Sequence, residues 1–349
     1  MRAAIDSVIA RGWFVLGPEV DAFEHAFAAA SGAAHAIGVA NGTDAIALLL
    51  RAAEVGPGDE VIVPAMTAAF TALAVASLGA RPVIVDIDPS RMTLDPRAAE
   101  AAVTSRTRAI VPVHLYGQAA DLNAIQKIAD RHSLALIEDC CQAHLATYEG
   151  TPVGTRGIGG AFSFYPTKNL AALGDAGAVV TNDVAVAERV RRLRNGGQSV
   201  RYHHTECGIN SRLVEMQAAV LRVRLRGLPV ATARRRDLAR LYREILPPGL
   251  VLLEEFDAGH VYHLFAVRTN DRDGIQKTLS AAGIETLVHY PIALNDQRAF
   301  AAFHPAECPH ASRAAGELLS LPLHPNLQNA DAAAVADALG DIMKGRVSA

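Results

Sequence analysis

The sequence predicts a large, doubly wound α/β domain on a mostly parallel sheet, followed by a smaller C-terminal α/β domain. Short apolar runs rich in valine and isoleucine alternate with amphipathic stretches over the first two-thirds of the chain. This pattern is typical of a parallel sheet covered by helices on both faces. Hydrophobic residues make up 50% of the 349 residues and charged residues 20%, so the chain can bury a sizeable core. At roughly 100–200 residues per domain, the length allows two domains.

The elements of the first domain follow from the apolar runs in chain order. Each short run rich in β-branched residues predicts a strand. The segment 122–132 predicts a helix, because Ile125, Ile128 and Ala129 recur at helical spacing. The expected strands cover residues 36–40, 61–64, 82–87, 109–113 and 134–137, and the expected helices cover 45–53, 70–78 and 122–132.

The second domain is expected to begin where an arginine-rich helix follows the alternating strands and helices of the first domain. An arginine-rich helix over 234–246 should end at Pro247-Pro248-Gly249, because proline and glycine interrupt helices. A strand over 263–268, a helix over 273–282 and a strand over 284–288 then predict a small α/β unit. We therefore expect a large domain over residues 1–229 and a small one over 230–349.

Charge and composition exclude several classes of protein. The 33 basic residues are balanced by 36 acidic ones, a formal charge of −3, so the chain lacks the basic surface of a nucleic-acid-binding protein. No apolar run reaches the ~18 residues of a membrane span, and Met1-Arg2 does not lead into the apolar stretch of a signal peptide. We expect a cytoplasmic protein with no membrane partner. Four cysteines are too few for a disulfide framework.

Two segments that directly follow predicted strands carry polar groups. Ligands collect at the carboxyl ends of strands in open α/β sheets. Asn41-Gly42-Thr43 opens a helix, where free backbone N–H groups favour an anion such as phosphate; the alternative is an ordinary helix cap. Glu138 and Asp139 end an apolar strand. A buried carboxylate needs a partner, so we expect one of them to meet a cation or a protonated ring nitrogen, the alternative being a surface pair.

Lys168 stands apart from the other three lysines. Lys127, Lys277 and Lys344 lie on helix-like segments or in the C-terminal tail, whereas Lys168 lies in a loop rich in glycine, serine, proline and aromatic residues. A half-buried setting of this kind lowers the pKa of a lysine and lets its amine form a Schiff base. The alternative is a solvated surface charge.

These three features match the chemical needs of pyridoxal 5'-phosphate. Its phosphate needs the helix start, its pyridine nitrogen needs a carboxylate that keeps it protonated, and its aldehyde needs an amine. Neither the segment 203–207 nor the segment 308–310 offers a four-ligand set at zinc spacing, so no metal is expected.

A series of segments, in order along almost the whole chain, carries a resemblance to a known family. They are 17–20, 41–45, 58–64, 113–117, 138–139 with 142–144, 162–170, 210–213 and 289–291. Together they resemble the DegT/DnrJ/StrS family of pyridoxal-phosphate-dependent nucleotide-sugar aminotransferases. The resemblance implies the fold-type I architecture of the aspartate aminotransferases. It also implies an enzyme that moves an amino group from an amino acid, L-glutamate by preference, to a keto sugar linked to a nucleotide.

The resemblance also implies roles for the residues that surround the cofactor ring. Lys168 would form the Schiff base with the cofactor and would later move a proton between the carbon atoms of the bound imine. Asp139 would hold the protonated pyridine nitrogen. Gln142 would contact the ring hydroxyl.

Further matching residues are implied to hold the phosphate and the substrate. Gly42, Thr43 and Ser163 would hold the phosphate, joined by Asn210 from a second subunit, so that a homodimer would share its active sites. Tyr290 lies in a segment that resembles the family's sugar-facing loop and would contact the substrate; a buried structural tyrosine is the alternative.

Two departures from the family bear on the cofactor ring. The family usually has an aromatic residue that stacks on the pyridine, but here Thr67 is followed by Ala68, and Phe70, two positions on, does not share a helical face with that position. Cys140 and Cys141 stand where small alanines are common. Larger side chains beside the ring alter the fit of the cofactor.

The segment 113–117 most resembles family members that act on thymidine-diphosphate sugars, with C3 of the ring as the favoured position. Two alternatives stay open. An aminocyclitol aminotransferase would use the same cofactor residues on a ring ketone without a nucleotide. A degenerate homologue would bind cofactor or sugar as a regulator, although the presence of both Lys168 and Asp139 favours an enzyme.

Overall fold

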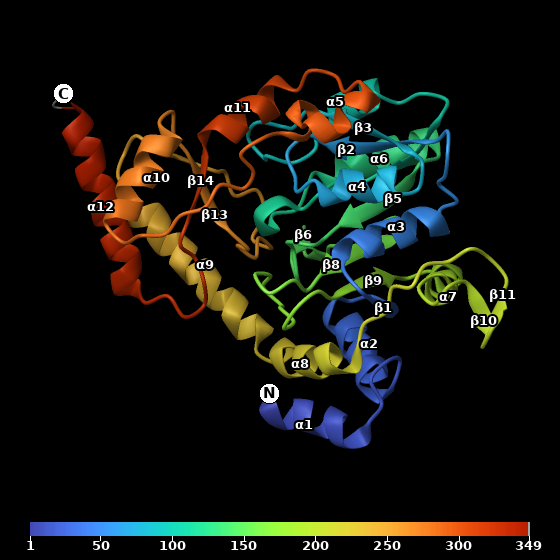
Figure 1. The fold of residues 1–349 in the computed structure, drawn as a ribbon. Helices are drawn as coiled ribbons and strands as arrows, with labels where there is room; N and C mark the ends of the chain where they lie inside the picture. The colour runs from blue at the N-terminus through green and yellow to red at the C-terminus, as the bar shows by residue number, and fades with distance from the viewer. Residues whose placement is uncertain (348–349) are drawn as a thin grey trace.

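A computed structural model describes residues 1–347 and has a seven-stranded sheet at its centre (Figure 1). The strand order is β1-β9-β8-β5-β4-β2-β3, and within this sheet β9 alone runs antiparallel to its neighbours. The predicted, mostly parallel sheet is thereby confirmed. The strands are β1 (His35–Val39), β2 (Glu60–Pro64), β3 (Arg81–Val85), β4 (Thr107–Ile110), β5 (Ala135–Asp139), β8 (Gly159–Ser163) and β9 (Gly177–Thr181).

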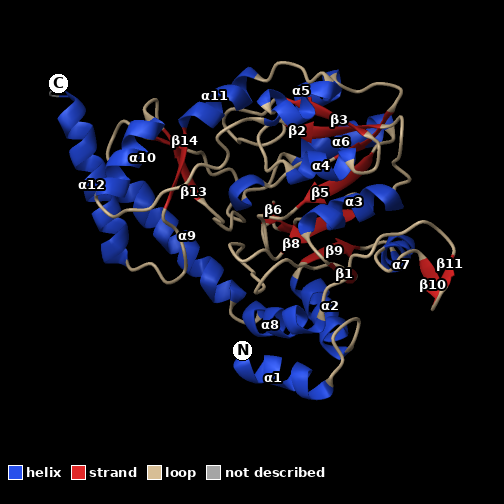
Figure 2. Cartoon of the chain, in the orientation of Figure 1, coloured by secondary structure: helices blue, strands red, loops and turns tan. Residues whose placement is uncertain are grey.

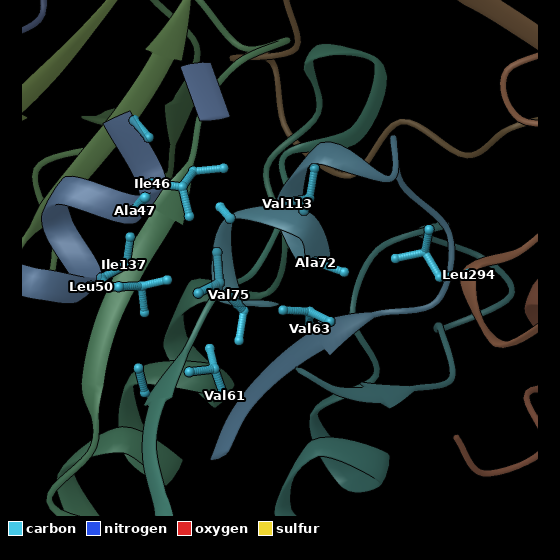
Figure 3. Close-up of a cluster of buried hydrophobic side chains, with 14 of the residues drawn as sticks. Ile46, Ala47, Leu50, Val61, Val63, Ala72, Val75, Val113, Ile137 and Leu294 are labelled. Carbon is cyan, nitrogen blue, oxygen red and sulfur yellow. The ribbon is translucent and has the colours of Figure 1, made fainter. Parts of the chain in front are cut away.

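Helices cover both faces of this sheet. Val61 and Val63 of β2 pack into one apolar cluster with α3 and α4, whereas Ile62 between them packs with α5 and α6 on the other face. Figure 3 shows Val61 and Val63 near Leu50 of α3 and Val75 of α4. The first face carries α3 (Gly42–Ala52), α4 (Phe70–Ala76) and α7 (Val184–Leu193); the second carries α2 (Pro18–Ala30), α5 (Pro96–Ala101), α6 (Leu122–His132) and α8 (Glu215–Leu225).

The strands β8 and β9 were not expected from the sequence. Gly159 and Gly160 open β8, and glycine gives little apolar signal. The close packing of the chain explains why glycine is needed, because a Cβ on Gly160 would lie 2.4 Å from the Cα of Gly154. β9 lies between β1 and β8. Together β8 and β9 connect β1 to β5, so that the polar residues after β1, β8 and β5 lie along the same edge of the sheet.

The C-terminal part forms a second layered unit (Figure 2). A three-stranded antiparallel sheet, β12 (Val251–Leu252), β13 (Phe265–Arg268) and β14 (Leu318–Leu321), packs with α9 (Leu228–Ile245), α10 (Arg272–Ala281) and α12 (Asn329–Val347). The expected strand over 284–288 is wrong. β14 takes the place beside β13, and the 284–288 segment contributes a single bridge between Leu287 and Ser320.

Segments of the C-terminal part return to the large sheet. Leu294 belongs to the core cluster around β2 and α3 (Figure 3), and its backbone N–H donates to the carbonyl of Ala65 at 2.8 Å. The domain boundary near residue 230 stays a prediction, with α9 running across it. The returning elements are η2 (Leu294–Asp296), η3 (Arg298–Phe303) and α11 (Pro309–Glu317). The segment that carries Tyr290 is therefore held by the core on its C-terminal side.

The remaining elements are short or peripheral. Among residues 1–347, no helix combines the length and apolar character needed to cross a membrane. The elements are α1 (Arg2–Arg11), η1 (Leu115–Gly117), β6 (Thr147–Tyr148), β7 (Thr151–Pro152), β10 (Gln198–Val200) and β11 (His203–His204).

Candidate active site

The three features predicted at strand ends come together at one edge of the large sheet. β1, β8 and β5 run parallel to one another, so their carboxyl ends meet at the same edge. α3 starts there after β1, Ser163 ends β8 and Asp139 ends β5. The segment that carries Lys168 follows β8 directly. An anion-binding helix start, an acid and an amine therefore share one site.

Asp139 is buried, with 4% of its surface exposed. Its Oδ1 accepts a hydrogen bond from the backbone N–H of Cys141 at 3.1 Å, and its Oδ2 accepts one from the Thr71 hydroxyl at 2.8 Å. A carboxylate has about four acceptor positions, so Asp139 keeps lone pairs for a cation or a protonated ring nitrogen. Because Glu138 is fully buried too, the alternative of a surface pair is wrong.

Glu138 lies on the opposite face of the strand from Asp139. Its Oε2 lies 2.9 Å from His114 Nε2, and its Oε1 accepts the N–H of Arg156 at 2.8 Å. His114 Nδ1 accepts the N–H of Ala120 at 3.1 Å, so the imidazole proton sits on Nε2 and is donated to Glu138. In the described part of the chain, His114, Glu138 and Cys140 are the group that brings three potential metal ligands together. A protonated Nε2 cannot ligate a metal, so this cluster is structural.

Lys168 is half-buried, whereas Lys127 and Lys277 are exposed on α6 and α10. Its backbone N–H donates to the carbonyl of Tyr165 at 2.8 Å, so a tight turn after β8 presents the amine. Burial lowers the pKa of the Lys168 amine, against the opposing effects of the Cys141 thiol and Asp139. The neutral, nucleophilic form of the amine is thereby favoured, and the setting differs from that of a solvated surface charge.

Gly42, Cys141 and Ser163 form a close-packed wall of the site. A Cβ on Gly42 would lie 2.6 Å from Cys141 Sγ and 2.8 Å from Ser163 Cβ. The absence of a side chain at Gly42 lets the free N–H groups at the start of α3 approach Ser163. Asn41 caps α3 by accepting a backbone N–H of the first turn at 2.8 Å, so the helix-cap alternative is correct for Asn41. Thr43 lies in this first turn and is half-buried.

Gln142 connects the cofactor side of the site to the segment that carries Tyr290. Its Nε2 donates to the Tyr290 hydroxyl at 2.9 Å, and its Oε1 accepts the backbone N–H of Tyr116 at 2.8 Å. The Tyr116 hydroxyl donates to the carbonyl of His289. Burial, and after it Asp139, raise the pKa of Tyr290, so its hydroxyl stays protonated. Since this hydroxyl accepts from Gln142, its own proton is available to a bound molecule.

Asn210 stands apart from the other predicted residues. It is exposed, and its backbone forms an isolated bridge with Asn195. The next residue, Ser211, is buried and accepts the N–H of Ala40 at 3.0 Å, which anchors Asn210 near the end of β1. Within residues 1–347, no hydrogen bond joins the Asn210 side chain to another predicted site residue. The role of Asn210 at the phosphate, implied by the resemblance, stays a prediction.

Two buried side chains at the site were not assigned from the sequence. Thr71 binds Asp139 from the first turn of α4. His144 lies in a segment that carried the resemblance, and its Nε2 lies 2.8 Å from the carbonyl of Ser163. Burial, with a smaller effect of Lys168, lowers the pKa of His144 to about 3, so the neutral imidazole donates its Nε2–H and fixes the end of β8. His144 could have been singled out because it lies in a segment that carries the resemblance, whereas nothing in the sequence marks Thr71.

The residues fit pyridoxal phosphate. The start of α3 at Gly42 lies beside Ser163 and offers helix N–H groups to a phosphate. Asp139 has free lone pairs for a protonated ring nitrogen, and Lys168 offers an amine with a lowered pKa. The position where the family usually has a stacking aromatic does not fit in the same way. Ala68 stands there and is half-buried, and the nearby Phe70 is 62% exposed.

Sequence comparisons agree with this geometry. The DegT/DnrJ/EryC1/StrS aminotransferase family matches residues 1–340. The dTDP-3-amino-3,4,6-trideoxy-alpha-D-glucose transaminase of Streptomyces venezuelae is 48% identical over 348 residues, covering 97% of this chain and 92% of the relative. The dTDP-3-amino-3,6-dideoxy-alpha-D-galactopyranose transaminase of Aneurinibacillus thermoaerophilus is 43% identical, covering 97% of this chain and 94% of the relative.

A solved structure extends the agreement to the whole fold. DesV of S. venezuelae, solved in complex with a ketimine intermediate, matches with a TM-score of 0.95 and 47% sequence identity over 98% of this chain and 93% of that chain. The match covers both the large sheet and the C-terminal unit, so the chain has the fold-type I architecture of pyridoxal-phosphate-dependent transferases, as the resemblance implied. The chain belongs to the DegT/DnrJ/EryC1/StrS aminotransferase family.

Proposed function

We propose that this chain uses pyridoxal phosphate to transfer an amino group from L-glutamate to the ketone of a nucleotide-linked keto-deoxyhexose. A dTDP-linked 3-keto-6-deoxyhexose is the favoured acceptor, because both transaminase relatives carry a dTDP-3-amino sugar in their names. The names of these two relatives contain no aminocyclitol, the other acceptor that the sequence left open. We place the reaction in the cytoplasm, since its proposed substrates are small, charged and soluble.

The observation that carries the proposal is the meeting of Asp139, Lys168 and the Gly42 wall at one edge of the sheet. Each supplies a different chemical function, namely a buried acceptor, an amine of lowered pKa and a helix start packed closely against Ser163. A regulatory homologue without catalysis would need none of this reactivity in its lysine. The combination therefore favours an enzyme.

The residues of the chain divide the work of amino transfer among them. Once bound, the cofactor supplies a protonated ring that accepts the electron pair left behind when a proton leaves the neighbouring carbon. Lys168 Nζ holds the cofactor covalently and, when released, takes the α-proton of the amino donor and delivers it to a second carbon. The Asp139 carboxylate keeps the ring nitrogen protonated. Gly42, Thr43 and Ser163 hold the phosphate.

Gln142 and Tyr290 form the side of the site that faces the substrate. Gln142 has one amide N–H engaged by Tyr290 and a second that can reach the ring hydroxyl. The Tyr290 hydroxyl, protonated and with its hydrogen free to donate, suits an oxygen of the sugar. One such hydrogen bond can decide between acceptors that differ in a single group.

The homodimer is part of the proposal, because Asn210 completes the phosphate site only from a neighbouring copy. Asn210 is exposed in the single chain. Large apolar side chains are also exposed, including Trp13 at 54%, Phe70 at 62% and Tyr202 at 76%. Exposed aromatic residues are typical of surfaces that become buried on association. They support a shared interface in which each subunit lends Asn210 to the other.

The test is the visible absorption spectrum of the purified protein with pyridoxal phosphate, before and after L-glutamate. We expect a band from cofactor bonded to a protein amine, loss of that band with glutamate, and, after borohydride reduction, a modified peptide that contains Lys168. Lys168→Ala should abolish the band and the transfer while the protein stays folded. Lys127→Ala, which removes an exposed lysine, is the control and should behave as wild type.

Each other outcome identifies a different error. A label on another lysine would remove Lys168 from the proposal. A band that no amino donor bleaches would support the regulatory homologue. Transfer to a keto-inositol in preference to a dTDP-linked keto sugar would replace the acceptor and leave the cofactor chemistry intact.

A further inference from the structure

We propose that Thr71 is a positioning residue that keeps the proton between Asp139 and the cofactor on the ring nitrogen, with Thr67 supporting it. The inference rests on the proposed function, since it concerns how Asp139 serves pyridoxal phosphate. It assigns a task to two buried hydroxyl groups that the proposed mechanism does not otherwise use.

The first observation is the contact between Thr71 and Asp139. The Thr71 hydroxyl lies 2.8 Å from Asp139 Oδ2 and only 1% of the residue is exposed. The opposite oxygen, Oδ1, accepts the backbone N–H of Cys141 at 3.1 Å. Each oxygen of the carboxylate thus receives one donor from the protein, and the two donors fix the plane of the carboxylate from both ends.

The second observation is the direction of the hydroxyl chain. Thr67 Oγ1 lies 3.3 Å from Thr71 Oγ1, and Thr67 is 3% exposed. A carboxylate only accepts hydrogen bonds, so the single Thr71 proton is committed to Asp139. Thr67 must therefore donate to Thr71. Both hydroxyl groups point their protons toward the carboxylate, and each bond strengthens the next.

The local fold explains why these two residues can serve Asp139. Thr67 lies in the loop after β2, and Thr71 lies in the first turn of α4. β2 is parallel to β4, and β4 to β5, so the end of β2 and the end of β5 share the same edge of the sheet. The start of α4 is thereby held beside Asp139.

The consequence concerns the proton that Asp139 shares with a ring nitrogen. Hydrogen bonds donated to a carboxylate stabilise its ionised form, and a buried carboxylate with fewer donors takes up a proton more readily. With Thr71 in place, both oxygens of Asp139 already accept a hydrogen bond from the protein, which favours the proton on the ring nitrogen. Without that donor, the proton moves toward Asp139 and the ring loses its positive charge. The ring then accepts an electron pair less well.

The experiment measures the protonation of the ring nitrogen directly. Wild type, Thr71→Val, Thr71→Ser and Thr67→Val are loaded with pyridoxal phosphate labelled with ¹⁵N in the ring and compared by solid-state ¹⁵N NMR at neutral pH. The dissociation constant of the cofactor is measured for each variant by absorbance titration. Thr93→Val is the matched control, because Thr93 is also 1% exposed and, in the described structure, its buried hydroxyl has no hydrogen-bond partner.

We expect the ¹⁵N shift of Thr71→Val to move toward that of an unprotonated pyridine and its cofactor affinity to fall roughly tenfold, the scale of a lost charge-assisted hydrogen bond. Thr71→Ser should retain the wild-type shift, Thr67→Val should give a smaller change, and Thr93→Val should give none. A Thr71→Val shift equal to that of wild type would overturn the inference. If Thr71→Val does not fold, Thr67→Val alone decides in the same way. A wild-type protein that binds no cofactor would instead refute the proposed function.

Discussion

Replacing Gly42 with alanine perturbs the wall between the start of α3 and the end of β8. The new Cβ would lie 2.6 Å from Cys141 Sγ, 2.8 Å from Ser163 Cβ and 3.4 Å from Ser163 Cα. The thiol ends a short side chain and can turn away. Ser163 cannot, because its Cβ is attached to β8, which pairs with β5 and β9 on its two sides. Either Ser163 or the first turn of α3 must therefore move.

The magnitude follows from two opposing terms. Overpacking a buried position costs about 1–3 kcal/mol, whereas alanine in place of glycine favours a helix by up to about 1 kcal/mol. Gly42 has no positive φ, so alanine adds no backbone strain. We expect a net loss of roughly 1–2 kcal/mol and a fall in Tm of a few degrees. The affinity for pyridoxal phosphate should fall by about tenfold or more, because a shift of the phosphate-binding N–H groups costs at least one hydrogen bond to a charged group.

Thermal unfolding and absorbance titration with pyridoxal phosphate measure the two effects. Gly316→Ala is the control, because Gly316 lies exposed in α11 and a Cβ there would meet nothing within 4 Å; its Tm should be unchanged or slightly higher. The double variant Gly42→Ala, Cys141→Ala should recover the part of the loss that comes from the thiol. A Gly42→Ala protein with wild-type Tm and wild-type cofactor affinity would refute both the packing argument and the assignment of the phosphate site.

Three further predictions concern other parts of the protein. Asp139→Asn should retain some cofactor but lose most turnover in a glutamate assay, because an amide does not hold the ring nitrogen protonated; an unchanged rate would remove Asp139 from the site. Lys168→Ala and Asn210→Ala subunits that are unfolded, mixed in equal amounts and refolded together should recover about a quarter of wild-type activity. Half of the dimers are then mixed, and one of the two sites in each mixed dimer is intact. No recovery would contradict sharing of the site across the interface. Burial raises the pKa of Glu60, but hydrogen bonds from Thr104 and Arg106 outweigh this effect and hold the pKa below 4.5. The ionised Glu60 therefore stabilises the fold above pH 4.5, and this stabilisation is lost as the pH falls through the lowered pKa. Glu60→Gln should therefore flatten the acid limb of a Tm-against-pH curve.

Most of the parallel sheet could be predicted because its strands are apolar on both faces. Val61, Ile62 and Val63 read as a strand without knowledge of any partner, and alternate residues pack on opposite faces. β8 could not be predicted in this way, because Gly159 and Gly160 are chosen for close approach and not for apolar area. The 284–288 segment shows the converse error, since it was expected to be a strand but forms a single bridge between Leu287 and Ser320, while β14 pairs with β13.

The same difference separates the predicted site residues from the missed ones. Lys168 and Asp139 carry chemistry that few other residue types supply, so their positions after strands, taken together with the helix start at Gly42, pointed to one cofactor. Thr71 carries no such signal. A threonine in the first turn of a helix is common, and its importance depends on Asp139, 68 positions away in the sequence. Residues that act through a contact, and not through their own reactivity, become visible only when the fold brings the partner close.

Cys141 shows how a departure from the family fits beside the start of α3. A thiol at this position is larger than the small residue common in the family, and its Sγ occupies space next to the start of α3. Gly42, which lies in a segment that carries the family resemblance, has no Cβ, so the thiol meets no side chain there. The two positions are coupled. Alanine at 42 would crowd the Cys141 thiol, which can turn away, and Ser163, which cannot, so alanine at 141 would relieve only the contact with Sγ. The effect of alanine at 42 on cofactor affinity should therefore depend on the residue at 141.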